Sequence, residues 1–461
     1  MKIDPKSAGI GQEDLGRPSG FGEVDKASTD VILQRASKST RQDHLAGVAS
    51  SNADTSQVQN ALIALLAAAS GLLVSNLYLS QTLVGPIGHA LGMSQESRGL
   101  IVTLTQLGYC AGLLLLVPLA DLVENRRLSA MLAAGCSLTV LTQGLTAHPS
   151  TFLAACFGVG FFASAIQILV PLAAHFSPPE ASGRAVGTVM SGLMMGIMLS
   201  RPVSSAIAQL FGWKAVFGLS SAVALATAVG LWKLLPERHP ETRQSYLQLI
   251  GSMAKLYVTT PILLQRACYQ AFMFGAFSAF WTAVPLYLAG PELGLDQGKI
   301  AVFALIGVAG VVGAPLAGMA ADRGYVLTVT VAAMLTVAAS FAFTLLPYSG
   351  WWKIGLLLVA ALGIDLGATA NLVVGQKEVF ALGAEARSRL NGLFIATFFV
   401  GGALGSALGA WAFAKGGWEL TALWGAALPM TALVALAMVE SYRRVDARGL
   451  AGTTTSAGAE P

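Results

Sequence analysis

Charged residues are scarce in this chain of 461 residues. Asp, Glu, Lys and Arg together make up 11% of it, whereas 54% of the residues are hydrophobic. An ordinary soluble domain carries about 25% charged residues. The composition therefore excludes a typical soluble protein and indicates a chain that folds in lipid.

Cysteine is also sparse, and the sequence lacks the usual signatures of enzyme chemistry. Cys110, Cys136, Cys156 and Cys268 all lie in apolar segments without the spacing of a metal site, which predicts buried small side chains. No phosphate-binding Gly-Lys-Ser/Thr loop occurs, so ATP is not expected to drive this chain directly. The sequence predicts no enzyme activity, no cofactor and no metal.

The first 60 residues lack any apolar periodicity. They are rich in Ser, Asp, Lys, Gly and Gln, which predicts a disordered cytoplasmic tail over residues 1–60. No apolar stretch follows the start closely enough to form a secretory signal peptide. The first membrane helix is therefore expected to act as the targeting signal.

Twelve apolar stretches of about 20 residues follow this tail, and this is the length that an α-helix needs to cross the hydrocarbon core. Six of them predict an N-terminal bundle over residues 61–235, and six predict a C-terminal bundle over residues 267–439. Residues 236–266 between them are predicted to form a central cytoplasmic loop, and residues 440–461 a second cytoplasmic tail.

Basic residues are distributed unequally between the two predicted sides of the membrane. Fifteen lie on the side shared by the central loop and both termini, and five lie on the other side. Because short loops rich in Lys and Arg stay in the cytoplasm, both termini are predicted to be cytoplasmic. Topology explains this basic surplus, so no nucleic-acid partner is expected.

The two halves of the chain resemble each other. When the sequence is shifted by 205 residues, "PEASGRAVG" falls on "AEARSRLNG", Arg184 falls on Arg389 and Gly196 on Gly401. Eight of the 34 positions from 180 to 213 are identical in this alignment. Duplication is the simplest explanation, and parallel repeats of six helices are a known transporter architecture.

The ends of the second and eighth spans, "VPLADLVENRRL" and "GMAADRG", carry a loop motif. They resemble the motif of the major facilitator superfamily, in which a glycine is followed four residues later by an aspartate and then by basic residues. Gly318, Asp322 and Arg323 match it, whereas the first copy has Val117 at the glycine position and Glu124 where a second glycine is usual.

The longer stretches "PLAAHFSPPEASGRAVGTVMSG" and "RSRLNGLFIATFFVGGALGSALGAWAFAKGGW" are similar to the arabinose-efflux-permease-like group of that superfamily. The resemblance implies an all-α membrane protein with twelve transmembrane helices in two pseudo-symmetric six-helix bundles. It also implies a multi-pass protein of a bacterial inner membrane.

Charged residues at the predicted cytoplasmic helix ends are candidates for a gate that opens and closes as the two bundles rock. The alternative is that they are topology signals and solvated loop charges, because exposed ion pairs contribute little. The candidates are Asp121, Arg126, Arg127, Glu180, Arg184, Asp322, Arg323, Glu385 and Arg389.

The fifth span contains the unusual sequence "GIMLSRPVSS". It resembles the antiporter motif of superfamily exporters, with Ser200 at a glycine position, Arg201 at the proline position and the proline one place later at Pro202. An arginine deep in a membrane helix costs about 2.5 to 3.5 kcal/mol on insertion scales, so it usually faces a cavity or a partner. Arg201 is expected to bind an anionic substrate group or to pair with a carboxylate, or else to snorkel to the outer interface.

One carboxylate lies near the middle of a predicted span, Asp365 in "ALGIDLGATANLVVGQ". A membrane carboxylate that exchanges protons with both sides is a common basis of proton coupling, so Asp365 and Arg201 are the proton-coupling candidates. The alternative for Asp365 is a structural hydrogen bond between helices.

Polar side chains also occur on the first, fourth, seventh and tenth spans, which line the central cavity in the superfamily. Amides with an aromatic wall suit a polar or amphipathic organic molecule, although each residue also fits a role in helix packing. The substrate-cavity candidates are Asn76, Gln81, Gln167, Gln270, Trp281, Asn371 and Gln376.

These observations predict a secondary active transporter that works by alternating access. The preferred hypothesis is an antiporter for proton-coupled efflux of a small organic molecule, drug-like or sugar-like. A proton-coupled importer and a non-transporting membrane sensor are the alternatives. The expected partners are the substrate, protons and the lipid bilayer, and the expected state is a monomer.

Overall fold

The computed structural model describes residues 57–240, 244–307, 313–382 and 387–456, and it describes side chains within 57–240, 244–305, 315–382 and 389–442. The chain divides into the units Met1–Gln59 and Asn60–Pro461. The second unit holds every element described below, apart from the first turn of the first helix. The tail predicted over residues 1–60 lies almost wholly outside the described residues.

The N-terminal half of this unit forms six membrane passes. The first pass is the helix Gln57–Ser75, followed by a run of turns, by the short helix η1 (Gln81–Leu83) and by α2 (Val84–Ala90). The second pass consists of η2 (Ser97–Gly99), α3 (Leu100–Leu115) and η3 (Val117–Asp121), and the third is α4 (Asn125–Leu145). The fourth pass consists of α5 (Pro149–Ala163) and α6 (Ile166–His175). The fifth and sixth passes are α7 (Ser182–Phe211) and α8 (Trp213–Leu234).

The C-terminal half also forms six passes. They are built from α10 (Pro261–Leu288), α11 (Gln297–Gly307) with α12 (Gly313–Asp322), α13 (Val326–Phe343), α14 (Gly350–Ala381) and α15 (Arg387–Ser456). Element α15 holds two passes, because its backbone leaves the helical conformation at Gly416 and Gly417. Gly417 has φ +60°, a value that glycine adopts at little cost. Among the described residues, ten helices are long and apolar enough to cross a membrane, and the longest of them holds two passes, which confirms the predicted all-α membrane fold.

The segment between the halves contains a helix that the loop prediction did not include. Element α9 (Tyr246–Thr259) begins at Ser245, whose hydroxyl accepts a hydrogen bond from the backbone N–H of Gln248, while the Gln248 side chain accepts one from the backbone N–H of Ser245. The next helix, α10, starts at Pro261, because proline suits the first turn of a helix. Arg266, which the sequence places in the loop, therefore lies inside α10 and is 7% exposed.

Each half contains the same kind of close contact between two of its own helices. A Cβ atom added to Gly196 of α7 would overlap the backbone of Gly71 in the first helix, and one added to Gly401 of α15 would overlap the backbone of Ala271 in α10. Only glycine permits such an approach between helices in lipid. Because Gly196 and Gly401 are counterparts under the shift of 205 residues, this contact agrees with the duplication.

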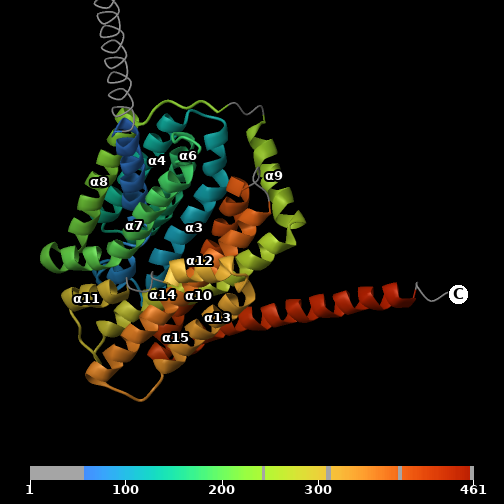
Figure 1. The fold of residues 1–461 in the computed structure, drawn as a ribbon. Coiled ribbons are helices and arrows are strands. Elements are labelled where there is room, and N and C mark those ends of the chain that lie inside the picture. Colours follow the sequence, from blue (N-terminus) through green and yellow to red (C-terminus); the bar gives the residue numbers. More distant parts are fainter. Residues whose placement is uncertain (1–56, 241–243, 308–312, 383–386, 457–461) are drawn as a thin grey trace, which may run out of the picture. The chain divides into compact units, whose positions relative to one another are not determined.

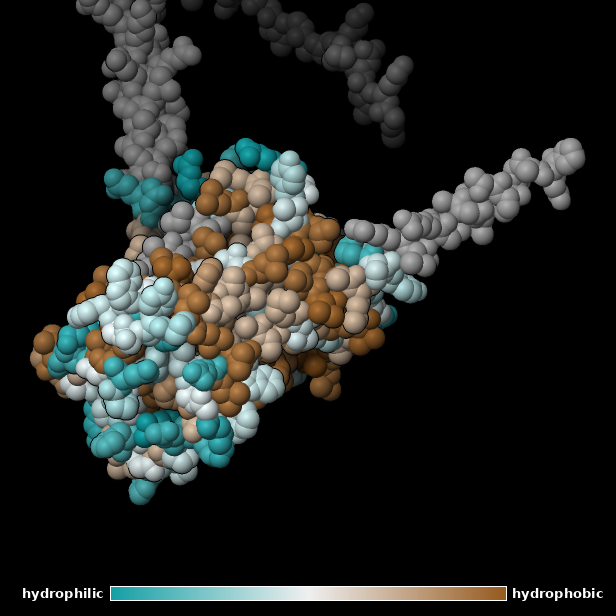
Figure 2. Space-filling model, turned by 90° about the horizontal axis from the view of Figure 1, so that it is seen from below, coloured by the Kyte–Doolittle hydropathy of each residue, from teal (hydrophilic) through white to brown (hydrophobic). Residues whose placement is uncertain are grey.

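Figure 1 shows the helices of the two halves as two groups, with α9 at the edge of the molecule. Element α9 contacts η3 of the first half and both α10 and α15 of the second half. Figure 2 shows apolar side chains over much of the visible face and hydrophilic ones gathered toward its margins. Large apolar side chains such as Leu199, Leu404 and Trp424 are exposed, as expected of a surface that faces lipid.

Candidate functional site

The guanidinium of Arg201 lies between the two halves and not at the outer interface. Arg201 is 5% exposed, and its Nη1 atom lies 3.9 Å from Oδ2 of Asp365 on α14. Asp365 is 7% exposed. The structure thus brings together the two proton-coupling candidates, which come from different halves of the chain.

Trp281 of α10 contacts both charges of this pair. Its indole N–H donates a hydrogen bond of 2.8 Å to Oδ1 of Asp365, and its ring centroid lies 4.0 Å from Cζ of Arg201. The rings of Phe277 and Tyr78 lie 5.1 and 5.9 Å from the same carbon atom. An aromatic face attracts a cation, so Arg201 is held by both the carboxylate and the rings.

The backbone around Arg201 explains part of the sequence "SRPVSS". Pro202 lies inside α7 and has no N–H to donate to the preceding turn. The hydroxyl of Ser204 donates to the carbonyl oxygen of Arg201 at 3.0 Å, and it lies 3.1 Å from the hydroxyl of Thr82 in η1. These contacts join α7 to the irregular end of the first pass beside the backbone carbonyl of Arg201.

Arg201 and Asp365 line a central cavity of about 260 Å³. The cavity extends from this pair to Val186 and Met190 in the first turns of α7 and to Phe380 near the end of α14. These residues lie toward the predicted cytoplasmic side. Within the described residues, Nε of Arg201 has no hydrogen-bond partner, so the guanidinium keeps a donor for a ligand.

Three of the seven predicted cavity residues line this cavity, namely Gln167, Gln270 and Gln376. Asn371 lies behind them and donates to Oε1 of Gln270 at 2.7 Å. Trp281 supports the charge pair from a fully buried position.

Asn76 and Gln81 lie away from the cavity lining. The amide oxygen of Asn76 accepts a hydrogen bond of 2.7 Å from the Ser220 hydroxyl, so this residue packs the first pass against α8. Gln81 is fully buried, and its amide has no hydrogen-bond partner among the described residues.

The sequence analysis expected an aromatic wall but named only Trp281, whereas other aromatic residues form the lining of the cavity. Its members are Tyr78, Tyr109, Phe274, Phe277, Phe380, Phe398 and Phe399. The hydroxyl of Tyr109 accepts a hydrogen bond of 3.1 Å from Gln167. The spacing of Phe274, Phe277 and Trp281 along α10 places them on one helix face and is a signal that could have revealed this wall.

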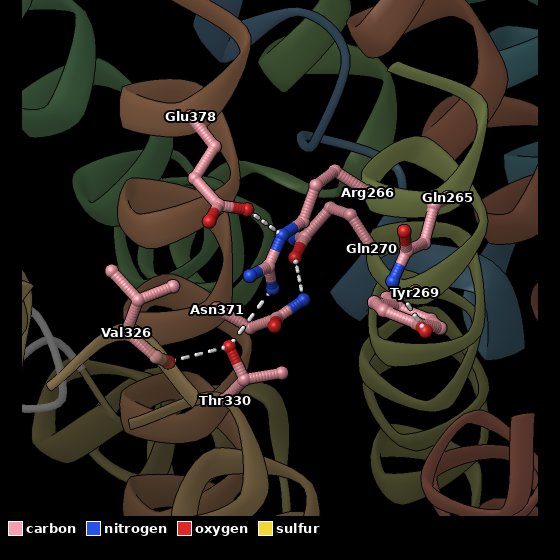
Figure 3. A network of polar contacts seen from close by, with 8 residues as sticks. All are labelled: Gln265, Arg266, Tyr269, Gln270, Val326, Thr330, Asn371 and Glu378. Atoms are coloured by element: carbon pink, nitrogen blue, oxygen red, sulfur yellow. Dashed lines mark hydrogen bonds and ion pairs between the residues drawn. The ribbon is translucent and has the colours of Figure 1, made fainter. Parts of the chain in front are cut away.

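A second buried arginine joins three helices of the C-terminal half, as Figure 3 shows. Nε of Arg266 contacts the carboxylate of Glu378 on α14, and Nη1 donates to the hydroxyl of Thr330 on α13 at 2.9 Å. The Gln270–Asn371 hydrogen bond joins the same two helices about one turn further along α10 and about two turns further along α14. These polar contacts fix α14, the helix that carries Asp365, against α10 and α13.

The two halves touch each other at the end of the cavity that is predicted to face outward. The hydroxyl of Thr103 donates to the carbonyl oxygen of Ala403, and the hydroxyl of Ser406 donates to that of Gly99, both at 3.2 Å. An ion pair joins Lys415 to Glu96 at 2.7 Å. These contacts between the halves close the cavity on its predicted outer side.

The predicted gate residues separate into three groups. Asp121 and Arg389, from different halves, line one pocket of about 160 Å³ together with Arg238. Other members pair within one half: Arg126 with Glu237, Arg127 with Glu124 at 3.5 Å, and Asp322 with Lys377 at 2.7 Å. Glu180, Arg184 and Arg323 are exposed and have no ion pair among the described residues, and Glu385 lies outside these residues.

Comparisons with known proteins agree with this architecture. The sequence model of the Major Facilitator Superfamily matches residues 62–383. An uncharacterized transporter of Escherichia coli O157:H7, YgaY, is 36% identical over 384 residues, which cover 82% of this chain and 95% of the relative.

More distant similarities extend to a named exporter and to a solved structure. A probable sugar efflux transporter of Helicobacter pylori is 23% identical over 77% of this chain and 89% of its own length. The crystal structure of a mutant of the nucleoside transporter NupG superposes with a TM-score of 0.66 at 14% identity, over 82% of this chain and 99% of that chain. This last similarity concerns the fold alone.

Proposed function

The chain belongs to the Major Facilitator Superfamily of membrane transporters, and from this premise we propose that it exports a small organic molecule in exchange for protons. The observation that carries the proposal is the buried pair of Arg201 and Asp365 at the end of the central cavity. Both candidate charges line one cavity, so a proton and a substrate that enter it would reach the same carboxylate.

Protonation of Asp365 changes an attraction between the halves. The ionised carboxylate attracts the guanidinium of Arg201, which is on α7 of the first half. When the carboxylate binds a proton, its charge and this attraction are lost. Because α7 and α14 belong to different bundles, the proton favours separation of the halves at this level and therefore couples to their rocking motion.

The Arg201–Asp365 pair also determines which substrates can be exchanged for protons and which would be cotransported with them. In an antiporter the proton and the substrate must exclude each other. A substrate that donates from a hydroxyl or an ammonium group to the Asp365 carboxylate competes directly with the proton. An anionic substrate bound to Arg201 would instead favour the protonated carboxyl group and would produce cotransport. Exchange therefore predicts a hydroxyl-rich or cationic substrate.

Alternating access supplies the rest of the proposed mechanism. The outer side is closed by the contacts of Thr103 and Ser406, and the cavity reaches toward the side where the positive residues predict the cytoplasm. We assign both termini to the cytoplasm of a cell that holds the monomer in its inner membrane. Asp121 and Arg389 are positioned to meet when the inner side closes.

The test is proton movement in proteoliposomes that contain the purified chain and a pH-sensitive dye. Sugars, cationic drugs and organic anions are loaded inside the vesicles, and their outward gradient is expected to draw protons inward for the exchanged substrate. Asp365→Asn should abolish this movement, whereas Asp296→Asn, a change in an exposed outer loop, should preserve it.

Each other outcome contradicts part of the proposal. Protons that leave together with the substrate would identify cotransport, and the importer would replace the exporter. Coupled movement that survives in Asp365→Asn would place the proton site elsewhere. Binding of a ligand without any proton or ligand flux would favour a sensor.

A further inference from the structure

A large apolar groove lies apart from the central cavity, where α9 covers the junction of α3, α10 and α15. Its volume is about 840 Å³, and its walls include Leu114 of α3, Met253 of α9, Phe272 of α10 and Leu393 of α15. The few polar side chains in its lining include Tyr257 and Thr397, whose hydroxyl groups are hydrogen-bonded to each other at 3.2 Å. The groove therefore offers apolar surface and few free polar groups.

The position and length of the groove fit a lipid chain. Along α15 it runs from Leu393 to Leu408, which is 15 residues or about 22 Å. One leaflet of the hydrocarbon core is about 15 Å thick, so the groove crosses the leaflet on the predicted cytoplasmic side and passes the midplane. Its rim is open, because Leu115 is 46% exposed and Leu404 is 60% exposed. At this depth the material that fills an apolar groove is hydrocarbon.

A basic pocket adjoins the cytoplasmic end of the groove. Met253 lines both spaces, and the pocket also contains Arg238 and Arg389. Nη1 of Arg389 donates to the Ser252 hydroxyl of α9 at 3.0 Å, which holds it beside the groove. Among the described residues, neither arginine has a carboxylate within 4.0 Å, although Asp121 lines the same pocket.

We propose that the groove and this pocket form one binding site for an anionic phospholipid of the cytoplasmic leaflet. An acyl chain lies in the groove under α9, and the phosphate lies between Arg238 and Arg389. Two guanidinium groups recognise phosphate oxygens through charge-assisted hydrogen bonds, which a zwitterionic lipid satisfies less well because its ammonium group brings a positive charge to the same place. The site does not depend on the substrate or on the direction of transport.

Occupation of this site has a structural consequence. Element α9 contacts η3 of the first half and α10 and α15 of the second half, so a lipid under α9 contacts both halves at once. Its phosphate also competes with Asp121 for Arg389. The lipid is therefore expected to favour the arrangement in which the inner gate is open.

Native mass spectrometry of the full chain in detergent micelles tests the proposal. Dioleoylphosphatidylglycerol is expected to bind more tightly than dioleoylphosphatidylethanolamine. Arg389→Gln should weaken the binding of phosphatidylglycerol about tenfold, which is the loss expected for one charge-assisted contact, and should weaken that of phosphatidylethanolamine less. Ala254→Trp should fill the groove and weaken both lipids, whereas Val258→Trp on the exposed face of α9 should weaken neither.

A measurement on the unaltered chain guards against a variant that fails to fold. Cys268 lines the groove and is partly exposed, whereas the other three cysteines are buried. Phosphatidylglycerol should slow its alkylation by an apolar maleimide more than phosphatidylethanolamine does. Equal protection by the two lipids, equal affinity for them, or unchanged binding in Ala254→Trp would overturn the proposal.

Discussion

Removal of one charge from the Arg201–Asp365 pair should destabilise the protein far more than removal of both. At the observed 3.9 Å, two opposite charges attract each other by about 4 kcal/mol if the effective dielectric constant is about 20. The loss of one partner leaves the other buried and unpaired, which costs about 3 to 5 kcal/mol. Replacing both by neutral side chains of similar size is often close to neutral.

The two single variants should differ from each other. In Arg201→Met the remaining carboxylate can bind a proton and lose its charge, and it keeps the hydrogen bond from Trp281. In Asp365→Asn the guanidinium stays charged, and only the rings of Trp281, Phe277 and Tyr78 remain beside it, of which that of Trp281 contributes up to about 2 kcal/mol. We therefore expect Asp365→Asn to lower the free energy of unfolding by about 3 kcal/mol, and Arg201→Met by less.

The measurement is a double-mutant cycle on the unfolding free energy, obtained from denaturation in mixed lipid and detergent micelles. The double variant Arg201→Met with Asp365→Asn should lie within about 1 kcal/mol of the wild type, which gives a coupling energy of at least about 2 kcal/mol. If the two single effects simply add within about 0.5 kcal/mol, the pair is not coupled and the reasoning is wrong.

Three further predictions concern the surroundings of this pair. Gly196→Ala should destabilise the protein, because the new Cβ would overlap the backbone of the first helix, whereas Gly187→Ala, with open space around it, should raise the unfolding free energy by about 0.5 to 1 kcal/mol. Trp281→Phe keeps a ring for the guanidinium but removes the hydrogen bond to the carboxylate, so a stability loss of about 1.5 to 3 kcal/mol is expected in the same denaturation assay. A short bifunctional thiol reagent should cross-link Glu96→Cys to Lys415→Cys and block substrate flux, and flux that continues after complete cross-linking would argue against closure at this point.

The membrane passes could be predicted from the sequence because the physical requirement is local. A helix that crosses the hydrocarbon core needs about 20 apolar residues, and the twelve stretches satisfied it one by one. Element α9 escaped this reasoning, since its 14 residues are too few to cross the hydrocarbon core, and Leu249 and Met253 are buried against protein. The seventh pass was placed too late because Arg266 looked like a loop residue, although Glu378 and Thr330 provide partners within the fold.

The candidate site could be predicted only in part, because partners in space are distant in sequence. Arg201 and Asp365 stood out individually as charges within apolar runs, whereas their 3.9 Å separation depends on how α7 and α14 pack. Asn76 is as polar as Gln270, yet one faces α8 and the other the cavity. The direction in which an amide points is decided by helix rotation, and a single sequence does not contain this information for helices that are apolar on every side.

The shift of 205 residues places Ser406 where the first half has Arg201. Ser406 donates to Gly99 across the outer contact, so one position of the ancestral repeat serves as a seal in one copy and as a charge in the other. The backbone arrangement is therefore repeated in both halves, whereas the charged side chain at this position occurs in only one of them. The axis that relates parallel repeats runs along the membrane normal, so the single charge makes the two halves different without exchanging the two sides of the membrane. The attraction between the halves can thus be adjusted at Arg201 without altering the close glycine contacts that recur in both copies.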